Sequence, residues 1–249
     1  MRLTSKFFRS AARAEAPVTG RHRRELRADD LARLITHLDA GPAAVLGSSG
    51  DAVSVLALAR AHPEPAHTVI AHESPSDQLV PDREDLLRRT DEMVATYLAG
   101  DRVGAWRRFM AIANIHMPDE LVEHVFGGER SPQDLADERF QYEHMLRPTV
   151  RWVPDLDALR TASTRVVVGI GEDSGGELCE RTSLALASGL GVEPTRFPGG
   201  HFGFVDAPDR FVVRLREVLS ESEPGLRTEP PATVGASLSP GGVRVWPEV

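Results

Sequence analysis

A short stretch between residues 42 and 53 constrains the fold of this chain more than any other. It reads Pro-Ala-Ala-Val-Leu-Gly-Ser-Ser-Gly-Asp-Ala-Val: an apolar run, a turn of glycine and serine, and the start of a helical pattern. This order predicts a strand that ends in a sharp turn and passes directly into a helix. Such a turn can raise the hydroxyl group of Ser49 above the end of a parallel sheet, where it could act as a nucleophile.

Ser49 is a better candidate than Ser48 for steric reasons. A sharp strand-to-helix turn brings together the residues two before and two after its apex, so both should be small. For Ser49 these are Gly47 and Asp51, whereas for Ser48 one of them is Leu46, which the strand needs. Asp51 is bulky for this position, but a negative charge is favourable in the first turn of a helix. The alternative is a turn that caps a helix and has no chemistry.

The rest of the chain predicts an α/β fold. Strands are expected at 43–46, 68–71, 165–170 and 192–197, and helices at 24–38, 52–61, 177–190 and 208–219. The first strand, its helix and the second strand form a βαβ unit, which requires parallel strands. Residues 76–150 carry only helical patterns, with helices expected at 84–98, 103–112, 119–126 and 132–146. This segment is predicted to be a helical insert.

Composition bounds the organisation and the partners. The 249 residues allow one large domain, which we place at 1–221, while the Pro-, Gly- and Ser-rich segment 222–249 is predicted to be a disordered tail. The net charge of −8 argues against nucleic-acid binding. No apolar segment approaches the length of a membrane span. We expect a small-molecule substrate, no nucleic acid and no membrane partner, and a homo-oligomer is compatible with the sequence.

The chain has a single cysteine, Cys179, which cannot form an internal disulfide bond. Scarce cysteine fits a reducing compartment, so a cytoplasmic location is expected. The acidic neighbours Glu177 and Glu180 disfavour a thiolate. Cys179 is therefore expected to be a bystander in a helix.

A second informative segment, Phe-Pro-Gly-Gly-His-Phe-Gly-Phe, spans 197–204. It places His201 in a glycine-rich turn between the last predicted strand and the terminal helix. A general base for a serine hydroxyl must lie on a loop at the carboxyl edge of the sheet, as this one would. The other eight histidines are expected to be surface or packing residues.

Together, several segments resemble a bacterial α/β-hydrolase-fold family. They are Gly47-Ser48-Ser49-Gly50, the segments 59–63 and 69–75, and the ending from 197–201 through 209–211. The resemblance implies an α/β-hydrolase fold, with a mostly parallel sheet, helices on both faces and a helical cap at 76–150. It also implies hydrolysis of a small ester-like or related carbonyl substrate and the chain order serine, acid, histidine.

Two positions compete for the acid. The commonest family location follows the strand that ends at Ile170, where Asp173 stands one residue before the usual position, which is Ser174 here. A second known location is the end of the strand after the nucleophile helix, which here carries Glu73. A carboxylate at the tip of a buried strand needs a partner, and holding the imidazole of His201 would satisfy it. Glu73 is slightly preferred; alternatively it only ties down the loop that enters the cap.

The oxyanion hole is predicted to be incomplete. In the resembled fold one donor is the N–H after the nucleophile, here that of Gly50, and the other comes from an earlier His-Gly loop. No such loop precedes residue 42, so the domain is expected to be N-terminally shortened, with 4–10 as a remnant and an unpaired edge on the elbow strand. Three explanations of the missing loop are open. The true start codon lies further upstream, the remnant or a second subunit fills the gap, or the protein has lost catalysis.

The predicted function is that of an esterase-like serine hydrolase working through an acyl-enzyme. Ser49 attacks, His201 is the base, and Glu73 or Asp173 orients it. No metal is expected. No nucleotide cofactor is expected either, because Ser174 stands where a dinucleotide-binding turn that begins with Gly169 and Gly171 has its third glycine, and Gly175 comes one residue late. Apolar cap residues would line the pocket or simply pack within the cap: Trp106, Phe109, Met110, Tyr142 and Met145. The alternative is a non-catalytic ligand- or partner-binding protein with a degenerate α/β-hydrolase fold.

Overall fold

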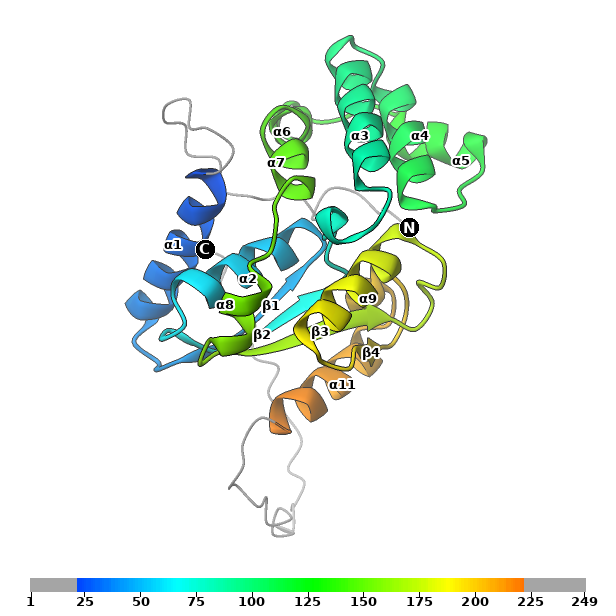
Figure 1. The fold of residues 1–249 in the computed structure, drawn as a ribbon. Coiled ribbons are helices and arrows are strands. Elements are labelled where there is room, and N and C mark those ends of the chain that lie inside the picture. Colours follow the sequence, from blue (N-terminus) through cyan, green and yellow to red (C-terminus); the bar gives the residue numbers. More distant parts are fainter. Residues whose placement is uncertain (1–21, 222–249) are drawn as a thin grey trace, which may run out of the picture.

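A four-stranded sheet forms the centre of the protein in a computed structural model, which describes residues 22–221 (Figure 1). The strands are parallel, as the βαβ pattern predicts for the first two, and they run in the order β1-β2-β3-β4. Their bounds are Ala43–Ser48, Ala66–His72, Arg165–Gly171 and Thr195–Phe197. The predictions for 4–10 and for the tail at 222–249 lie outside the described residues.

The fourth strand starts later than predicted. Residues 192–194 do not pair with β3, because Val192 completes the end of helix α9, Leu178–Leu190. Gly191 adopts a left-handed conformation, its N–H bonds to the carbonyl of Ser188, and the N–H of Val192 bonds to the carbonyl of Ala187. These two bonds form a Schellman cap, which uses the backbone donor that a strand would need.

Side chains alternate between the two faces of the sheet, and each face has its own core. On one face Val69, Ala71 and Val168 pack under four helices: α1 His22–Leu38, α2 Gly50–Ala61, α8 Leu156–Thr161 and α9. On the other face Ile70 and Val167 pack against α11, Pro208–Ser220. The sequence did not predict α8, but it predicted α1, α2, α9 and α11.

Between β2 and β3 the chain builds a layer of helices beyond the carboxyl ends of the strands, which we call the cap (Figure 1). The short helix η2, Asp77–Leu79, leads into it. Its helices are α3 Arg83–Leu98, α4 Arg102–Ala113, α5 Asp119–Phe126, α6 Pro132–Phe140, the π-helix Gln141–Met145 and α7 Leu146–Val150. The helix predicted at 132–146 is thus continued to Val150 and contains a π-helical turn.

The cap has a core of its own, made largely of aromatic rings. Tyr97 stacks on Tyr142 with ring centres 4.0 Å apart, and Trp106 stacks on Phe126 at 4.1 Å. Ion pairs to Asp91 of α3 from Arg147 of α7 and from Arg151, which follows α7, join these two helices.

Strand β1 lies at the edge of the sheet and pairs only with β2 within the described part of the chain. Its residue Ala44 is exposed. This edge position agrees with the unpaired elbow strand expected from the sequence. Within residues 22–221, no helix combines the length and the apolar character needed to cross a membrane.

Candidate functional site

The turn between β1 and α2 has the strained backbone of a sharp elbow. Ser49 is the only residue between the two elements. Its backbone angles, φ 55° and ψ −127°, are a combination that residues other than glycine rarely adopt. Its N–H donates to the carbonyl oxygen of His72 at 2.9 Å, which continues the β1–β2 pairing by one residue. Ser49 therefore stands at the apex of a turn that the sheet holds in place.

Gly47 is where this turn is tightest. A Cβ atom there would lie 2.3 Å from the carbonyl oxygen of Asp51 and 2.9 Å from Cγ1 of Val55. The close contact at Gly47 is with the backbone of Asp51, whereas the side chain of Asp51 is 75% exposed. The position two residues before the apex must therefore be glycine, whereas the position two residues after it tolerates an aspartate.

Ser48 is engaged elsewhere. Its hydroxyl shares a hydrogen bond of 3.0 Å with Nδ1 of His72, which is fully buried among the edges of phenylalanine rings. Burial lowers the pKa of His72 to about 4, so the ring is neutral at physiological pH. His72 lies in the core and Ser48 is half-buried beside it, so we interpret this hydrogen bond as structural.

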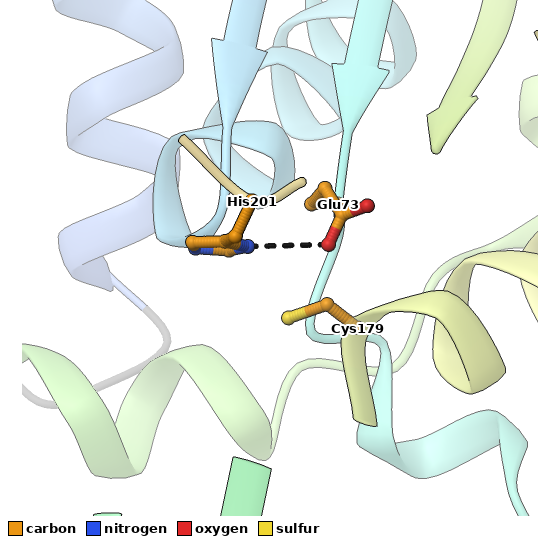
Figure 2. Close-up of side chains that lie close together, drawn as sticks. All are labelled: Glu73, Cys179 and His201. Atoms are coloured by element: carbon orange, nitrogen blue, oxygen red, sulfur yellow. Dashed lines mark hydrogen bonds and ion pairs between the residues drawn. The ribbon is translucent and has the colours of Figure 1, made fainter. Parts of the chain in front are cut away.

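Glu73 and His201 meet at the carboxyl edge of the sheet. Glu73 directly follows β2, is fully buried, and has a φ of 54°. Its Oε1 atom accepts a hydrogen bond from the N–H of Gly171 at 2.7 Å, and its Oε2 atom accepts one from Nδ1 of His201 at 3.2 Å (Figure 2). Burial by itself raises the pKa of Glu73, but these hydrogen bonds outweigh it and the net shift is downward, so the carboxylate is ionised.

Close backbone contacts hold the His201 loop against β3. The N–H of Asp173 donates to the carbonyl of Gly199 at 3.1 Å. Gly199 has a φ of +83°, and a Cβ atom there would lie 2.6 Å from Cα of Gly203. A Cβ atom on Gly171 would lie 2.7 Å from the carbonyl oxygen of Gly199. Gly171, at the end of β3, and Gly199, in the His201 loop, therefore let the two segments come close enough for His201 to reach Glu73.

The competing acid does not take part in this arrangement. The side chain of Asp173 is exposed and makes no hydrogen bond to His201 within the part of the chain that the structure describes. Ser174, which occupies the commoner family position for the acid, is buried. The structure thus brings Glu73, and not Asp173, to the histidine.

Strand register places Ser49 and Glu73 side by side. Ser48, the last residue of β1, pairs with His72, the last residue of β2, so Ser49 and Glu73 are the first residues beyond two paired strand ends. Ser49 and His201 share no hydrogen bond among residues 22–221.

Gly50 is the first residue of α2 and directly follows Ser49, so its N–H has no partner within the helix. A small pocket beside it is lined by Arg27, Gly50, Val53, Ser54, His144, Met145, Pro148 and Thr149. Of the five apolar cap residues considered from the sequence, only Met145 lines this pocket. The other four, Trp106, Phe109, Met110 and Tyr142, pack in the core of the cap.

Cys179 lies close to this site, which the sequence did not suggest. It is near the start of α9, and its Sγ atom lies within 4.8 Å of a ligand atom of Glu73 and of His201. Burial is the largest of the effects that raise the pKa of its thiol. The expectation of a helical cysteine is confirmed, but Cys179 borders the Glu73–His201 pair.

Comparisons with known proteins agree with this architecture. No protein-family model matches the chain. It is 27% identical over 206 residues, 81% of this chain and 72% of the relative, to a protein of Bacillus subtilis (strain 168) named uncharacterized hydrolase YraK.

Solved structures resemble the chain over most of its length. An α/β hydrolase from Sphaerobacter thermophilus superposes with a TM-score of 0.55 at 20% identity, covering 86% of this chain and 78% of the other. MenH from S. aureus gives a TM-score of 0.56 at 16% identity, with coverages of 86% and 80%. The order of elements, the elbow at Ser49 and these likenesses together show that the chain has the α/β-hydrolase fold.

Proposed function

We propose that the protein is a serine hydrolase that cleaves a small ester-like or related carbonyl substrate. Ser49 is the nucleophile, His201 the general base and Glu73 the residue that orients the imidazole. The relative that is named a hydrolase supports this class of reaction. The observation that carries the proposal is the arrangement of a strained serine beside a buried carboxylate that holds a histidine on a glycine-rich loop.

In the proposed mechanism, Ser49 Oγ attacks the substrate carbonyl carbon while Nε2 of His201 takes the hydroxyl proton. Glu73 keeps the remaining ring proton on Nδ1, which leaves Nε2 free to accept, and its negative charge stabilises the imidazolium that forms. The protonated histidine then gives its proton to the leaving alcohol, and an acyl-enzyme remains. Water attacks the acyl group by the same path in reverse and regenerates Ser49.

The N–H of Gly50 is the proposed donor to the oxyanion. It lies at the amino end of α2, where the partial positive charge of the helix favours a developing negative charge. Loss of one oxyanion donor typically costs about 2.7–4 kcal/mol of transition-state stabilisation. A site with Gly50 as its only donor would therefore be slow but still active.

A fluorophosphonate probe, which labels only activated serines, tests the proposal. The wild-type protein should be labelled, Ser49→Ala should not, and Ser48→Ala should still be labelled, because Ser48 already bonds to His72. Mass spectrometry of the labelled peptide checks the site directly. Absence of labelling in a folded wild-type protein would refute the hydrolase and favour the non-catalytic binding protein.

A further inference from the structure

The cluster of Glu73, Cys179 and His201 offers three different metal-ligand atoms at one point. A carboxylate oxygen, a thiol sulfur and an imidazole nitrogen all lie within 4.8 Å of one another. Figure 2 shows the Cys179 side chain pointing toward the space between the carboxylate of Glu73 and the imidazole ring of His201. No hydrogen bond to the sulfur occurs in the described part of the chain, so the thiol is not committed to another partner.

We propose that these three residues form a binding site for a thiophilic divalent cation, with Zn²⁺ as the best fit. A cysteine, a histidine and a carboxylate are the ligands that Zn²⁺ takes, and three protein ligands with one open position make a familiar tetrahedral set. Thiolate sulfur selects against the hard cations Mg²⁺ and Ca²⁺.

The spacing fits a tetrahedral ion after a small movement. Bond lengths of about 2.0–2.2 Å to nitrogen and oxygen put those two ligand atoms about 3.4 Å apart, and the longer bond to sulfur puts sulfur and nitrogen about 3.6 Å apart. Oε2 of Glu73 and Nδ1 of His201 are already 3.2 Å apart. The sulfur atom of Cys179 lies within 4.8 Å of the other two ligand atoms and must come about 1 Å closer to them. Rotation about the Cα–Cβ bond of Cys179 can supply this movement.

Charge and protons balance on binding. The bound ion is neutralised by one carboxylate and one thiolate, while the histidine is neutral. The thiol proton is released to solvent. The proton on Nδ1 of His201 moves through solvent to Nε2, because the metal takes the Nδ1 lone pair.

This site has a consequence that rests on the proposed function. With the metal on Nδ1, Nε2 carries a proton and cannot accept one from Ser49, and Glu73 no longer holds the ring in its active tautomer. The cation is therefore an inhibitor of the proposed hydrolysis. Binding itself does not depend on that function.

Cobalt is the probe for binding, because Co²⁺ replaces Zn²⁺ and a tetrahedral cobalt thiolate gives a strong charge-transfer absorption band. The full chain should develop this band on addition of Co²⁺ and lose it on addition of Zn²⁺. Cys179→Ser should abolish the band and weaken Zn²⁺ binding by about 100-fold or more, since even residues behind the ligands change metal affinity by 10–100-fold.

His62→Ala is the matched control. His62 pairs with Asp29 at 2.6 Å on the surface, so it is a histidine–carboxylate pair without a thiol. This variant should bind as the wild type does. Equal Zn²⁺ affinity in wild type and Cys179→Ser, or a cobalt complex without the thiolate band, would overturn the site.

A measurement on the wild type alone guards against misfolding of the variant. Cys179 is the only cysteine of the chain, so alkylation by iodoacetamide reports on it without ambiguity. Zn²⁺ should slow this alkylation and Mg²⁺ should not; no protection at saturating Zn²⁺ would refute the site.

The activity measurement separates the two proposals. Each variant is compared with its own metal-free rate of ester hydrolysis, with and without Zn²⁺. Inhibition that a chelator reverses, and that Cys179→Ser lacks, supports both proposals. A protein with the cobalt thiolate band but no hydrolysis in any condition refutes the proposed function and leaves the metal site standing.

Discussion

Glu73 and His201 are separated by 128 residues in the chain, yet Oε2 of one accepts a hydrogen bond from Nδ1 of the other. The carboxylate is fully buried, so nothing but the protein satisfies it. One of its oxygen atoms is bound by the N–H of Gly171 and the other by the imidazole. This pairing favours Glu73 over Asp173 as the proposed acid, and it makes that proposal testable.

Glu73→Gln should lower the turnover of an ester substrate by about 10³- to 10⁴-fold, because an amide no longer fixes the imidazole tautomer or stabilises its charge. Asp173→Asn should change turnover by less than about threefold, since this side chain is exposed and does not bond to His201. Steady-state kinetics of the two variants provides the comparison. Full activity in Glu73→Gln, or a large loss in Asp173→Asn, would reverse the assignment of the acid.

Gly47→Ala should destabilise the protein by about 1–3 kcal/mol, because its Cβ atom would lie 2.3 Å from a carbonyl oxygen at the elbow. Gly175→Ala is the matched control, since its φ is not positive and a Cβ atom there meets no atom of the described residues within 4 Å. Urea unfolding measures both. Equal stability of the two variants would show that the elbow relaxes without cost.

Ser48→Ala should lower stability by about 1–2 kcal/mol, since it leaves Nδ1 of the buried His72 without its partner. Ser49→Ala removes a hydroxyl for which the structure gives no hydrogen bond among residues 22–221, and should change stability little. Probe labelling should respond in the opposite way, lost in Ser49→Ala and kept in Ser48→Ala. Thermal unfolding and labelling of the same samples therefore separate the structural serine from the proposed nucleophile.

Local sequence signals predicted much of the fold. The elbow required a small residue at Gly47, and the structure shows why. The helix at 119–126 follows Pro118 and ends before Gly127, and its bounds are confirmed to the residue. Helix α8 escaped notice, although Asp155 caps it by accepting a hydrogen bond from the N–H of Ala158. That N-cap was a usable signal, but a helix this short carries too little periodicity to stand out.

Tertiary relationships were harder to predict. The motif spacing around Asp173 says nothing about which loop reaches His201, because that depends on the close approach of Gly171 and Gly199. Cys179 appeared to be a bystander because its sequence neighbours are acidic, whereas its spatial neighbours include Glu73 and His201. The apolar cap residues have no pattern that separates pocket from core, and four of the five pack inside the cap.

Asp77 predicts a pH dependence of stability. It lies at the entry to the cap and is buried, and neither of its carboxylate oxygens has a hydrogen-bond partner among residues 22–221. Burial raises the pKa of Asp77 from 3.8 to about 7, whereas the unfolded chain keeps the ordinary value. Between these two pH values the folded protein holds a proton that the unfolded chain has lost.

The contribution of Asp77 to stability is therefore fully present below about pH 4 and is lost as the pH rises through about 7. The free energy of unfolding should fall over this range with a slope of up to about 1.4 kcal/mol per pH unit from this group. Asp77→Asn removes the titration, so the variant should be more stable than the wild type at pH 8, with the difference shrinking toward pH 5. Asp173→Asn is the control, because an exposed aspartate is not destabilised by burial of its charge. Urea unfolding at several pH values measures the free energy of unfolding of both proteins. If this free energy changes with pH in the same way in wild type and Asp77→Asn, Asp77 is not the source of the pH dependence.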